Sequence, residues 1–414
     1  MRGGTGGTLR ADAFPEAAIR ARATTGAAGA FPDPGGYGRL LYGYAPVTPA
    51  DMIDELRLVP PVFVPQRLAK LIDLTREPVY RDVELNTVVG GLPSMLPVYL
   101  SAFGSTQAVS VDLGVAASAQ AGRLGIPMVI GENVTLVNGY GRIEEHAQRS
   151  LLTRMTAYAE HALDGCGGVV VQQSTEDADA EVWNLAYSDP NVQTLLDSGR
   201  LAFELKVGQG AKPGLGGMTV LDAAAAPRLA SSYTIDPVFG ADSGTLLRSS
   251  SPGTFTEEIL HRQVLLMRNN YPRARIWVKL PPARDVREAA LVAWDSGADA
   301  VTVDGAEGGT GWAPLIFLQH VGLPLGECLR RIGQHPSCLL VSGRMWEGGR
   351  VAKCLALGAN AVGLGRAALI AVDTDAENGL VNLVGCLSLE LQMLISALGK
   401  YHVAELSAED LWPS

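Results

Sequence analysis

Two lysines frame a glycine-rich turn in the run Lys206-Val-Gly-Gln-Gly-Ala-Lys-Pro-Gly-Leu-Gly-Gly217. Lys206 ends an apolar stretch, so we expect it near the end of a buried strand, where a cation can stabilise negative charge that develops on a bound ring. Lys212 falls on the following loop, from which it can reach a substrate carboxylate. Both lysines are therefore candidate catalytic residues.

Two later segments have the composition of an anion site. They read Ser342-Gly-Arg-Met-Trp-Glu-Gly-Gly349 and Gly363-Leu-Gly-Arg-Ala-Ala368. Glycine lets the backbone approach an anion closely, amides at the start of a following helix can donate to it, and arginine adds positive charge. The candidate phosphate-binding residues are Gly343, Arg344, Gly363, Gly365 and Arg366.

A third segment, Asp304-Gly-Ala-Glu-Gly-Gly-Thr-Gly311, holds four glycines in eight residues. Such density costs chain entropy and indicates that a flat or phosphorylated ligand lies against the backbone. The candidate ligand-binding residues here are Glu307, Gly308, Gly309 and Thr310.

Two further polar residues follow β-rich runs. Glu132, in Gly131-Glu-Asn-Val134, is a candidate catalytic base or a carboxylate that orients an amine. Gln173 ends the run 168–173, and its carboxamide can both donate to and accept from a ring ligand. The sequence has no His-x-x-x-His pair and no Gly-x-Ser-x-Gly motif, so we expect neither a metal site nor a serine nucleophile.

Eight short runs rich in β-branched residues recur from residue 97 onward, and each ends in glycine or a polar residue. They cover 97–101, 127–131, 168–173, 202–208, 275–280, 300–304, 338–342 and 361–365. Helical segments lie between most of them, at 143–163, 257–269, 286–296 and 349–357. Strands that alternate with helices imply a parallel sheet. The pattern predicts an α/β fold, a (β/α)8 TIM barrel.

An open doubly wound sheet is the alternative, but no Gly-x-Gly-x-x-Gly follows the first strand. In a barrel, functional residues lie just after the strands, and phosphate loops follow strands seven and eight. The candidate residues occupy those positions.

We expect three parts in the chain: a flexible N-terminal arm over 1–36, an N-terminal extension over 37–96 packed on the barrel, and the barrel over 97–414 with a C-terminal helix. A long loop after strand four, from Pro213 to Pro252, is expected to cover the ligand site. The apolar stretch 380–398 contains polar residues that are costly in a bilayer, so we interpret it as a helix packed on the barrel.

Composition and charge limit the classes of partner that we expect for this protein. The 414 residues carry a net charge of −10, and acidic and basic residues are mixed along the chain, which argues against nucleic acid or membrane partners. Five cysteines without a Cys-x-x-Cys pair suggest reduced thiols and a cytoplasmic protein. A homo-oligomer with a small-molecule substrate is expected.

The runs 206–217, 304–311 and 390–400 resemble the FMN-binding barrel of glutamate synthase, and the likeness to stand-alone glutamate-synthase-like proteins extends over roughly residues 90 to 410. In that family the barrel uses FMN to reduce 2-iminoglutarate to glutamate, and electrons arrive through a 3Fe–4S cluster. The resemblance implies FMN as cofactor, with Lys206 and Lys212 at the flavin and oxoacid site and Glu132 as the acid of the family's Gly-Glu-Gly-Gly stretch. Ser101 and Ala102 match the strand-one segment under the flavin ring.

The chain departs from the family pattern at three places. Met218 stands where the family has a glutamine that helps to hold the oxoacid, and Gly131-Glu-Asn-Val134 replaces Gly-Glu-Gly-Gly. After strand eight only Cys386 remains, and one thiolate cannot hold an iron–sulfur cluster. The glutaminase domain is also missing, so a separate electron-transfer or amidotransferase partner is expected.

The resemblance favours hydride transfer at the α-carbon of an amino or imino acid. An FMN-dependent 2-hydroxy acid oxidase or dehydrogenase is the first alternative, although only His320 lies near a suitable strand end for its base. A non-catalytic FMN-binding partner subunit is the second. A barrel that forms a covalent thioimidate needs a cysteine after strand six, and that loop has none.

Overall fold

The computed structural model describes residues 32–41, 43, 51–103, 111–131, 145–174, 180–231, 233–240, 243–250, 252–310 and 312–412. Eight parallel strands form a closed barrel in the order β11-β12-β13-β14-β4-β5-β6-β7. Their bounds are β4 Val98–Phe103, β5 Pro127–Ile130, β6 Gly168–Ser174, β7 Leu201–Lys206, β11 Arg275–Leu280, β12 Ala300–Asp304, β13 Leu339–Ser342 and β14 Ala361–Leu364. Each predicted run coincides with one of these strands, and the predicted TIM barrel is confirmed.

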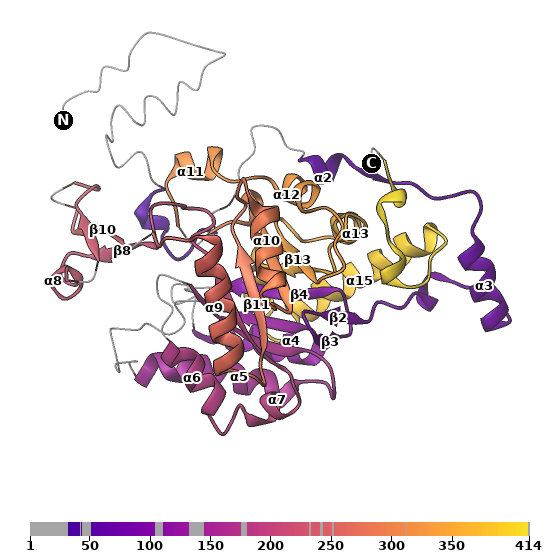
Figure 1. Cartoon of the computed structure of the whole chain (residues 1–414), viewed down its shortest axis with the longest axis horizontal. Coiled ribbons are helices and arrows are strands. Elements are labelled where there is room, and N and C mark those ends of the chain that lie inside the picture. Colours follow the sequence, from indigo (N-terminus) through magenta and orange to yellow (C-terminus); the bar gives the residue numbers. More distant parts are fainter. Residues whose placement is uncertain are drawn as a thin grey trace, which may run out of the picture.

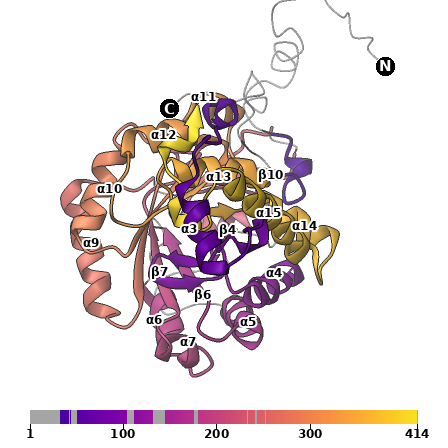
Figure 2. The ribbon, with the colours of Figure 1, turned by 90° about the vertical axis from the view of Figure 1, so that its right-hand side faces the viewer.

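Helices surround the barrel (Figures 1 and 2). They are α4 Val111–Leu124, α5 Glu145–His161, α6 Ala180–Ser188, α7 Gln193–Asp197, α9 Glu257–Asn270, α10 Val286–Asp295, α11 Leu315–His320, α12 Leu325–Ile332, α13 Gly348–Ala356, α14 Arg366–Thr374 and α15 Gly379–Ala397. In α9, Thr256 caps the first turn by accepting from the amide of Ile259, and Leu260, Val264 and Met267 are buried along one face. The helix forms because a local cap and an apolar stripe specify the same segment.

Alternation along the strands separates two apolar layers. One set of side chains packs inside the barrel: Tyr99, Val129, Val170, Ala202, Trp277, Ala300, Leu340 and Ala361. The residues between them, such as Val171, Phe203 and Val278, belong to the core between the strands and the helices. Because successive strand residues point to opposite faces, the residues two positions beyond the inner set also point inward, at the carboxyl ends of the strands.

The N-terminal residues form several short elements around the barrel. They are η2 Pro34–Gly36, α2 Met52–Glu55, β1 Arg57–Leu58, α3 Pro65–Leu74, η3 Tyr80–Asp82, β2 Thr87–Val89 and β3 Leu92–Ser94. Val89 and Leu92, from the β2–β3 hairpin, join the inner cluster, so the hairpin closes the amino end of the barrel. β1 pairs with the C-terminal strand β15, Leu411–Trp412, which follows η6 Val403–Glu405 and η7 Ala408–Asp410.

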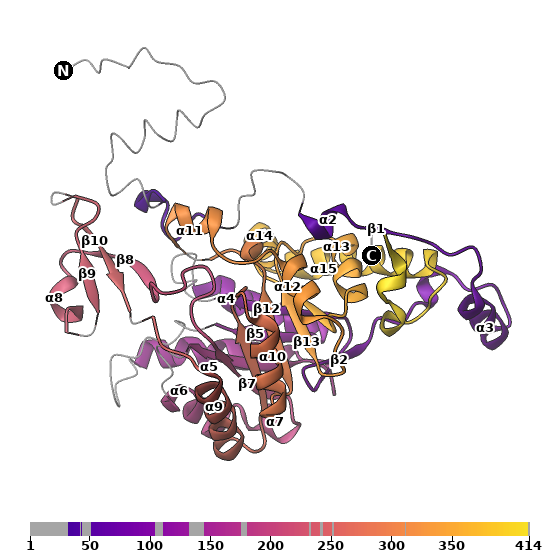
Figure 3. The same ribbon diagram turned by 45° about the horizontal axis from the view of Figure 1, so that its top comes forward.

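The segment after β7 differs from the predicted loop. It contains β8 Met218–Asp222, α8 Ala226–Leu229, β9 Thr234–Asp236 and β10 Thr245–Ser249, and the three strands form an antiparallel sheet in the order β8-β10-β9. Glycine, alanine and serine around these short strands obscured them in the sequence. Figures 1 and 3 show this added sheet at one end of the molecule, with α3 at the other.

Helix α15 has the length and composition of a membrane-spanning helix. In the fold it packs against α4, α13 and α14 and buries Leu380, Val384, Leu387, Leu391 and Ile395. Its apolar residues therefore contribute to the core between helices.

Gly90, in the turn between β2 and β3, is the point where the hairpin packs against Trp277 inside the barrel. Its φ is +57°, an added Cβ would lie 2.3 Å from Trp277, and the Trp277 Nε1 donates to the Gly90 carbonyl over 2.9 Å. Replacing Gly90 by alanine should lower the free energy of unfolding by about 2–5 kcal/mol, from left-handed strain and from overpacking.

Gly199→Ala is the matched control, because Gly199 has a φ of +68° and nothing within 4 Å of the added Cβ. Urea titration should show a loss of only about 1–2 kcal/mol there. Equal losses at the two positions would mean that the contact with Trp277 contributes nothing.

Candidate functional site

A cavity of about 540 Å³ opens at the carboxyl ends of the barrel strands. Strand ends, the loops after β7, β12, β13 and β14, the added sheet and residues 37–41 all contribute to its lining. Most of the predicted site residues meet here: Ser101, Ala102, Lys206, Lys212, Gly308, Gly309, Thr310, Gly343, Arg344, Gly363, Gly365 and Arg366. Segments that are far apart in the sequence are thus brought to one site.

Two predicted residues are placed differently, and a third is not among the described residues. Gln173 lies outside the cavity lining and donates from Nε2 to the main chain of Gln172, while Gln172 itself lines the cavity. The reason is alternation, since Gln173 shares its face of β6 with Val171 of the outer core. Glu307 is fully buried behind the loop and is an anchor for neighbouring loops. Glu132 lies outside the described residues.

A buried carboxylate lies just beneath the cavity. Glu204 accepts hydrogen bonds from Thr302 Oγ1, over 2.5 Å, and from Gln172 Nε2. Burial raises the pKa of the Glu204 carboxyl, and the nearby Lys279 opposes that shift without cancelling it. The bonds to Gln172 and Thr302 connect β7 to its neighbour β6 and, across β11, to β12.

Lys279 and Asp304 form an ion pair on the cavity floor. Lys279 Nζ lies 2.7 Å from Asp304 Oδ2, and Ser342 donates to the other carboxylate oxygen. Lys279 is the register partner of Lys206 on the adjacent strand, so two cations stand at the same level of the barrel. Lys279 was not predicted from the sequence, although it lies two residues after Trp277 on the same strand and therefore shares its inward face.

The two predicted lysines occupy different environments. Lys206 Nζ, at the end of β7, donates to Gln209 Oε1 over 3.1 Å. Lys212 is buried, with 7% of its surface exposed, and its Nζ donates to the Met218 carbonyl over 3.4 Å. Lys212 is therefore held against the wall of the cavity by the added sheet.

The outer wall combines aromatic and cationic groups. Trp312, Met218 and Leu247 form a small buried cluster, against which Tyr37 and Phe239 pack. Arg248 of β10 stacks over the ring of Tyr233 at 4.0 Å and also lines the cavity. Such a wall suits a ligand with a carboxylate and a flat or apolar part.

On the opposite side, glycines expose the backbone to the cavity. A Cβ added at Gly365 would meet nothing within 4 Å, and one at Gly308 would meet only atoms at 3.6 Å or beyond. Arg344, in the loop after β13, has a φ of +54°, a strained conformation for a residue with a side chain. This open backbone beside Arg366 can accommodate a phosphate group.

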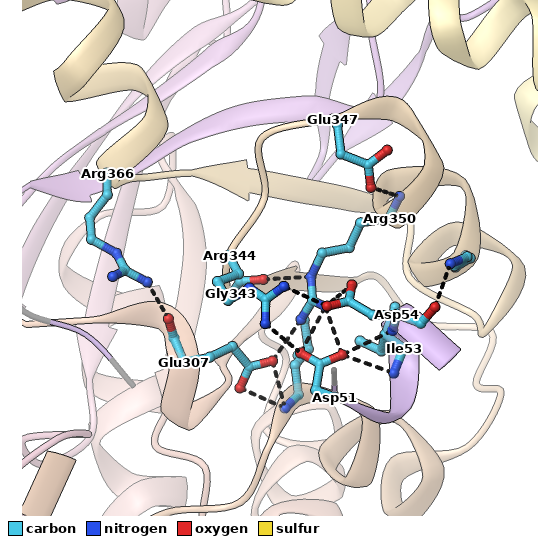
Figure 4. Close-up of polar contacts among 11 residues, drawn as sticks. Asp51, Ile53, Asp54, Glu307, Gly343, Arg344, Glu347, Arg350 and Arg366 are labelled. Atoms are coloured by element: carbon cyan, nitrogen blue, oxygen red, sulfur yellow. Dashed lines mark hydrogen bonds and ion pairs between the residues drawn. The ribbon is translucent and has the colours of Figure 1, made fainter. Parts of the chain in front are cut away.

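The loop after β13 is tied to the N-terminal helix α2 (Figure 4). Arg350, fully buried in α13, donates to Asp51 over 2.8 Å, to Asp54 over 2.9 Å and to Glu307 over 2.7 Å. Its Nε donates to the Gly343 carbonyl over 2.9 Å. A single guanidinium therefore joins α2 to the loops after β12 and β13.

Among the described residues, no group of three His, Cys, Asp or Glu side chains is arranged to hold a metal ion. The cysteines there are dispersed, with Cys328 and Cys354 buried and Cys386 exposed. His320 lies exposed at the end of α11, outside the cavity lining.

Comparison with known proteins gives a family match. The model of the family described as "Conserved region in glutamate synthase" matches residues 134–378. A glutamate synthase large subunit-like protein of Rhizobium meliloti is 32% identical, over 51% of this chain and 58% of that protein. An archaeal-type glutamate synthase [NADPH] of Dehalococcoides mccartyi is 29% identical, over 56% of this chain and 47% of that protein. The chain thus spans about half the length of these relatives.

A solved mandelate oxidase variant with an FMN adduct has the same fold. It superposes with a TM-score of 0.55 at 18% identity, and the match covers 87% of this chain and 88% of the oxidase.

The buried acid gives a pH-dependent prediction. Because folding raises the pKa of Glu204 above its ordinary 4.5, its contribution to stability is full below that value and is lost as the pH rises through the raised pKa. The stability of wild type relative to Glu204→Gln should therefore fall as the pH rises from the ordinary value of 4.5 through neutrality.

Denaturant unfolding of both proteins across that range provides the measurement, with exposed Glu160→Gln as the matched control. A wild-type-minus-variant difference that stays constant with pH would contradict the assignment.

Proposed function

Because the chain belongs to the glutamate synthase family, whose conserved region matches more than half of it, we propose that it is an FMN-dependent oxidoreductase that transfers hydride at the α-carbon of an amino or imino acid. The observation that supports this most strongly is the convergence of glycine-rich loops and basic side chains on one cavity at the carboxyl ends of the strands.

The residues present fit FMN. The cavity volume of about 540 Å³ is within the range of cofactor sites, and its described lining has six cationic side chains but only one carboxylate, that of Asp304. Open backbone at Gly365 and Gly308 would receive the phosphate end. Ser101, Gln172 and Lys279 would meet the ring, with polar groups that can donate and accept.

When bound, FMN would supply the hydride acceptor or donor. The protein's own contribution is orientation and charge. Lys206 places positive charge at the end of β7, beside the Lys279–Asp304 ion pair, while Lys212, held by the wall, would bind the substrate carboxylate. Trp312 and Met218 would exclude water from that end of the cavity.

The electron route and the nitrogen source are proposed to lie in a separate partner. After β14 the sequence has one cysteine, Cys386, which is exposed on α15. One thiolate cannot hold the iron–sulfur cluster that delivers electrons in the family. A 2-hydroxy acid as substrate is less well supported, because the histidine considered as its base, His320, lies outside the cavity lining.

The purified chain should carry non-covalent FMN and should lose its yellow colour anaerobically when an amino acid substrate is added. Chromatography of the heat-released cofactor identifies the flavin, and a panel of amino acids and 2-hydroxy acids identifies the substrate class. FAD in the extract would contradict the cofactor, and bleaching by 2-hydroxy acids alone would contradict the substrate class.

Lys206 and Lys212 should fail in different ways. Lys206→Met should lower the flavin reduction potential and slow reduction, by about 10²–10³-fold. Lys212→Met should retain FMN and its spectrum but lose apparent substrate affinity, since its contact exists before and during hydride transfer.

Flavin content, reduction potential and the substrate dependence of bleaching separate the two variants, and Lys70→Met on α3 is the control for loss of a surface lysine. If Lys212→Met loses FMN while Lys206→Met keeps an unchanged potential, the two roles are reversed. If both resemble Lys70→Met, the lysines have no part in the reaction.

A further inference from the structure

Arg344 and Arg366 both line the cavity next to the glycine-rich loops. Among the described residues, only Arg344 forms an ion pair with a carboxylate. Arg344 Nη2 lies 2.5 Å from Asp54 Oδ2, and its Nη1 lies 3.8 Å from Asp51. The guanidinium is thus drawn toward helix α2. Its charge is already opposed by carboxylates of the protein.

The charges of Arg344 and Arg350 are compensated without a ligand. Asp51, Asp54 and Glu307 supply three negative charges against the two positive charges of these arginines. Arg350 is buried and makes four hydrogen bonds, so it cannot turn toward the cavity without leaving buried acids unpaired. The same two aspartates therefore fix both arginines.

Arg366 is in a different position. Its Nη2 donates to the main-chain carbonyl of Glu307 over 2.5 Å, and no carboxylate of the described residues lies within ion-pair distance. Burial, with a smaller effect of Arg344, lowers the pKa of the Arg366 guanidinium, and the carboxylate of Glu307 opposes this shift without cancelling it. In Figure 4, Arg366 reaches Glu307 from the side away from Asp51 and Asp54.

The backbone of the loop supports the same distinction. Arg344 has a φ of +54°, in the left-handed region that favours glycine. A side chain there costs free energy unless a contact repays it, and the observed contact is the ion pair with Asp54. The residue thus holds the loop to α2.

We propose that Arg366, together with the loop amides, is the ligand of the cofactor phosphate, whereas Arg344 is a positioning residue that anchors the phosphate loop to Asp54 of α2. This inference rests on the proposed binding of FMN. Helix α2 then takes part in building the cofactor site. The two arginines, which the sequence suggested as equivalent phosphate ligands, have different roles.

Binding of FMN and of riboflavin to the apoprotein isolates the phosphate, because the two ligands differ only in that group. Arg366→Gln should weaken FMN at least about tenfold and leave riboflavin unchanged, as expected for a lost charge-assisted contact. Arg344→Gly should leave both affinities within about twofold, since glycine retains the loop amide and favours the observed φ.

A double-mutant cycle tests the anchor itself. Asp54→Asn frees Arg344 in its strained conformation, so FMN binding should weaken about threefold or more while riboflavin binding is unaffected. In the Arg344→Gly background the same substitution should cost clearly less, because no strained side chain is left to release. Riboflavin affinity also reports whether each variant is folded, and Arg366→Lys, which retains the charge, should lose less FMN affinity than Arg366→Gln.

Two results would overturn the inference. One is a loss of FMN affinity in Arg344→Gly as large as that in Arg366→Gln, with riboflavin spared, which would make Arg344 a direct ligand. The other is that Asp54→Asn weakens FMN binding by the same factor in the wild-type and in the Arg344→Gly background. Wild-type protein that binds neither flavin would instead contradict the proposed function, and this inference with it.

Discussion

In a closed parallel barrel, the inward-facing side chains of all eight strands must pack against one another, and this constraint determines the whole site. Below the cavity the shared level is apolar, with Tyr99, Trp277 and Leu340 among its members. Two residues further along each strand the inward side chains become polar, and low-dielectric surroundings make every unpaired group there costly. Glu204 is therefore held by Thr302 and Gln172, and Lys279 by Asp304. The floor of the cavity is a set of satisfied pairs that fix strand register.

Charge pairing also connects the barrel to the N-terminal residues. Arg350 links Asp51 and Asp54 of α2 to Glu307 and to the Gly343 carbonyl, so three separate segments depend on one buried guanidinium. Removal of Arg350 would leave the buried carboxylates of Asp51 and Glu307 without their shared partner, which is far more costly than the loss of a surface ion pair. The loops around the cavity are thus rigid where backbone must meet a ligand, and the added sheet provides a separate wall with its own cation, Arg248.

Much of this could be predicted from the sequence, because local pattern and chain order carry it. The β-rich runs located all eight strands, and glycine density located the loops after β12, β13 and β14. Pairing between distant residues was not predictable: nothing in the sequence near Asp54 indicates that it meets Arg344 and Arg350. Gln173 was predicted to face the ligand, whereas its neighbour Gln172 does so, and the choice between them required the strand register. The added sheet was missed because its strands are short and lie among small residues.

The central claim is that this cavity holds FMN, with its phosphate beside Arg366 and its ring above the polar level of the barrel. A crystal structure of the protein reconstituted with FMN tests it most directly. We expect the phosphate between the loops that begin at Gly343 and Gly365, and the ring against Ser101, Gln172 and Lys279. Flavin bound elsewhere, or a phosphate paired with Arg344 after Arg344 has left Asp54, would contradict it.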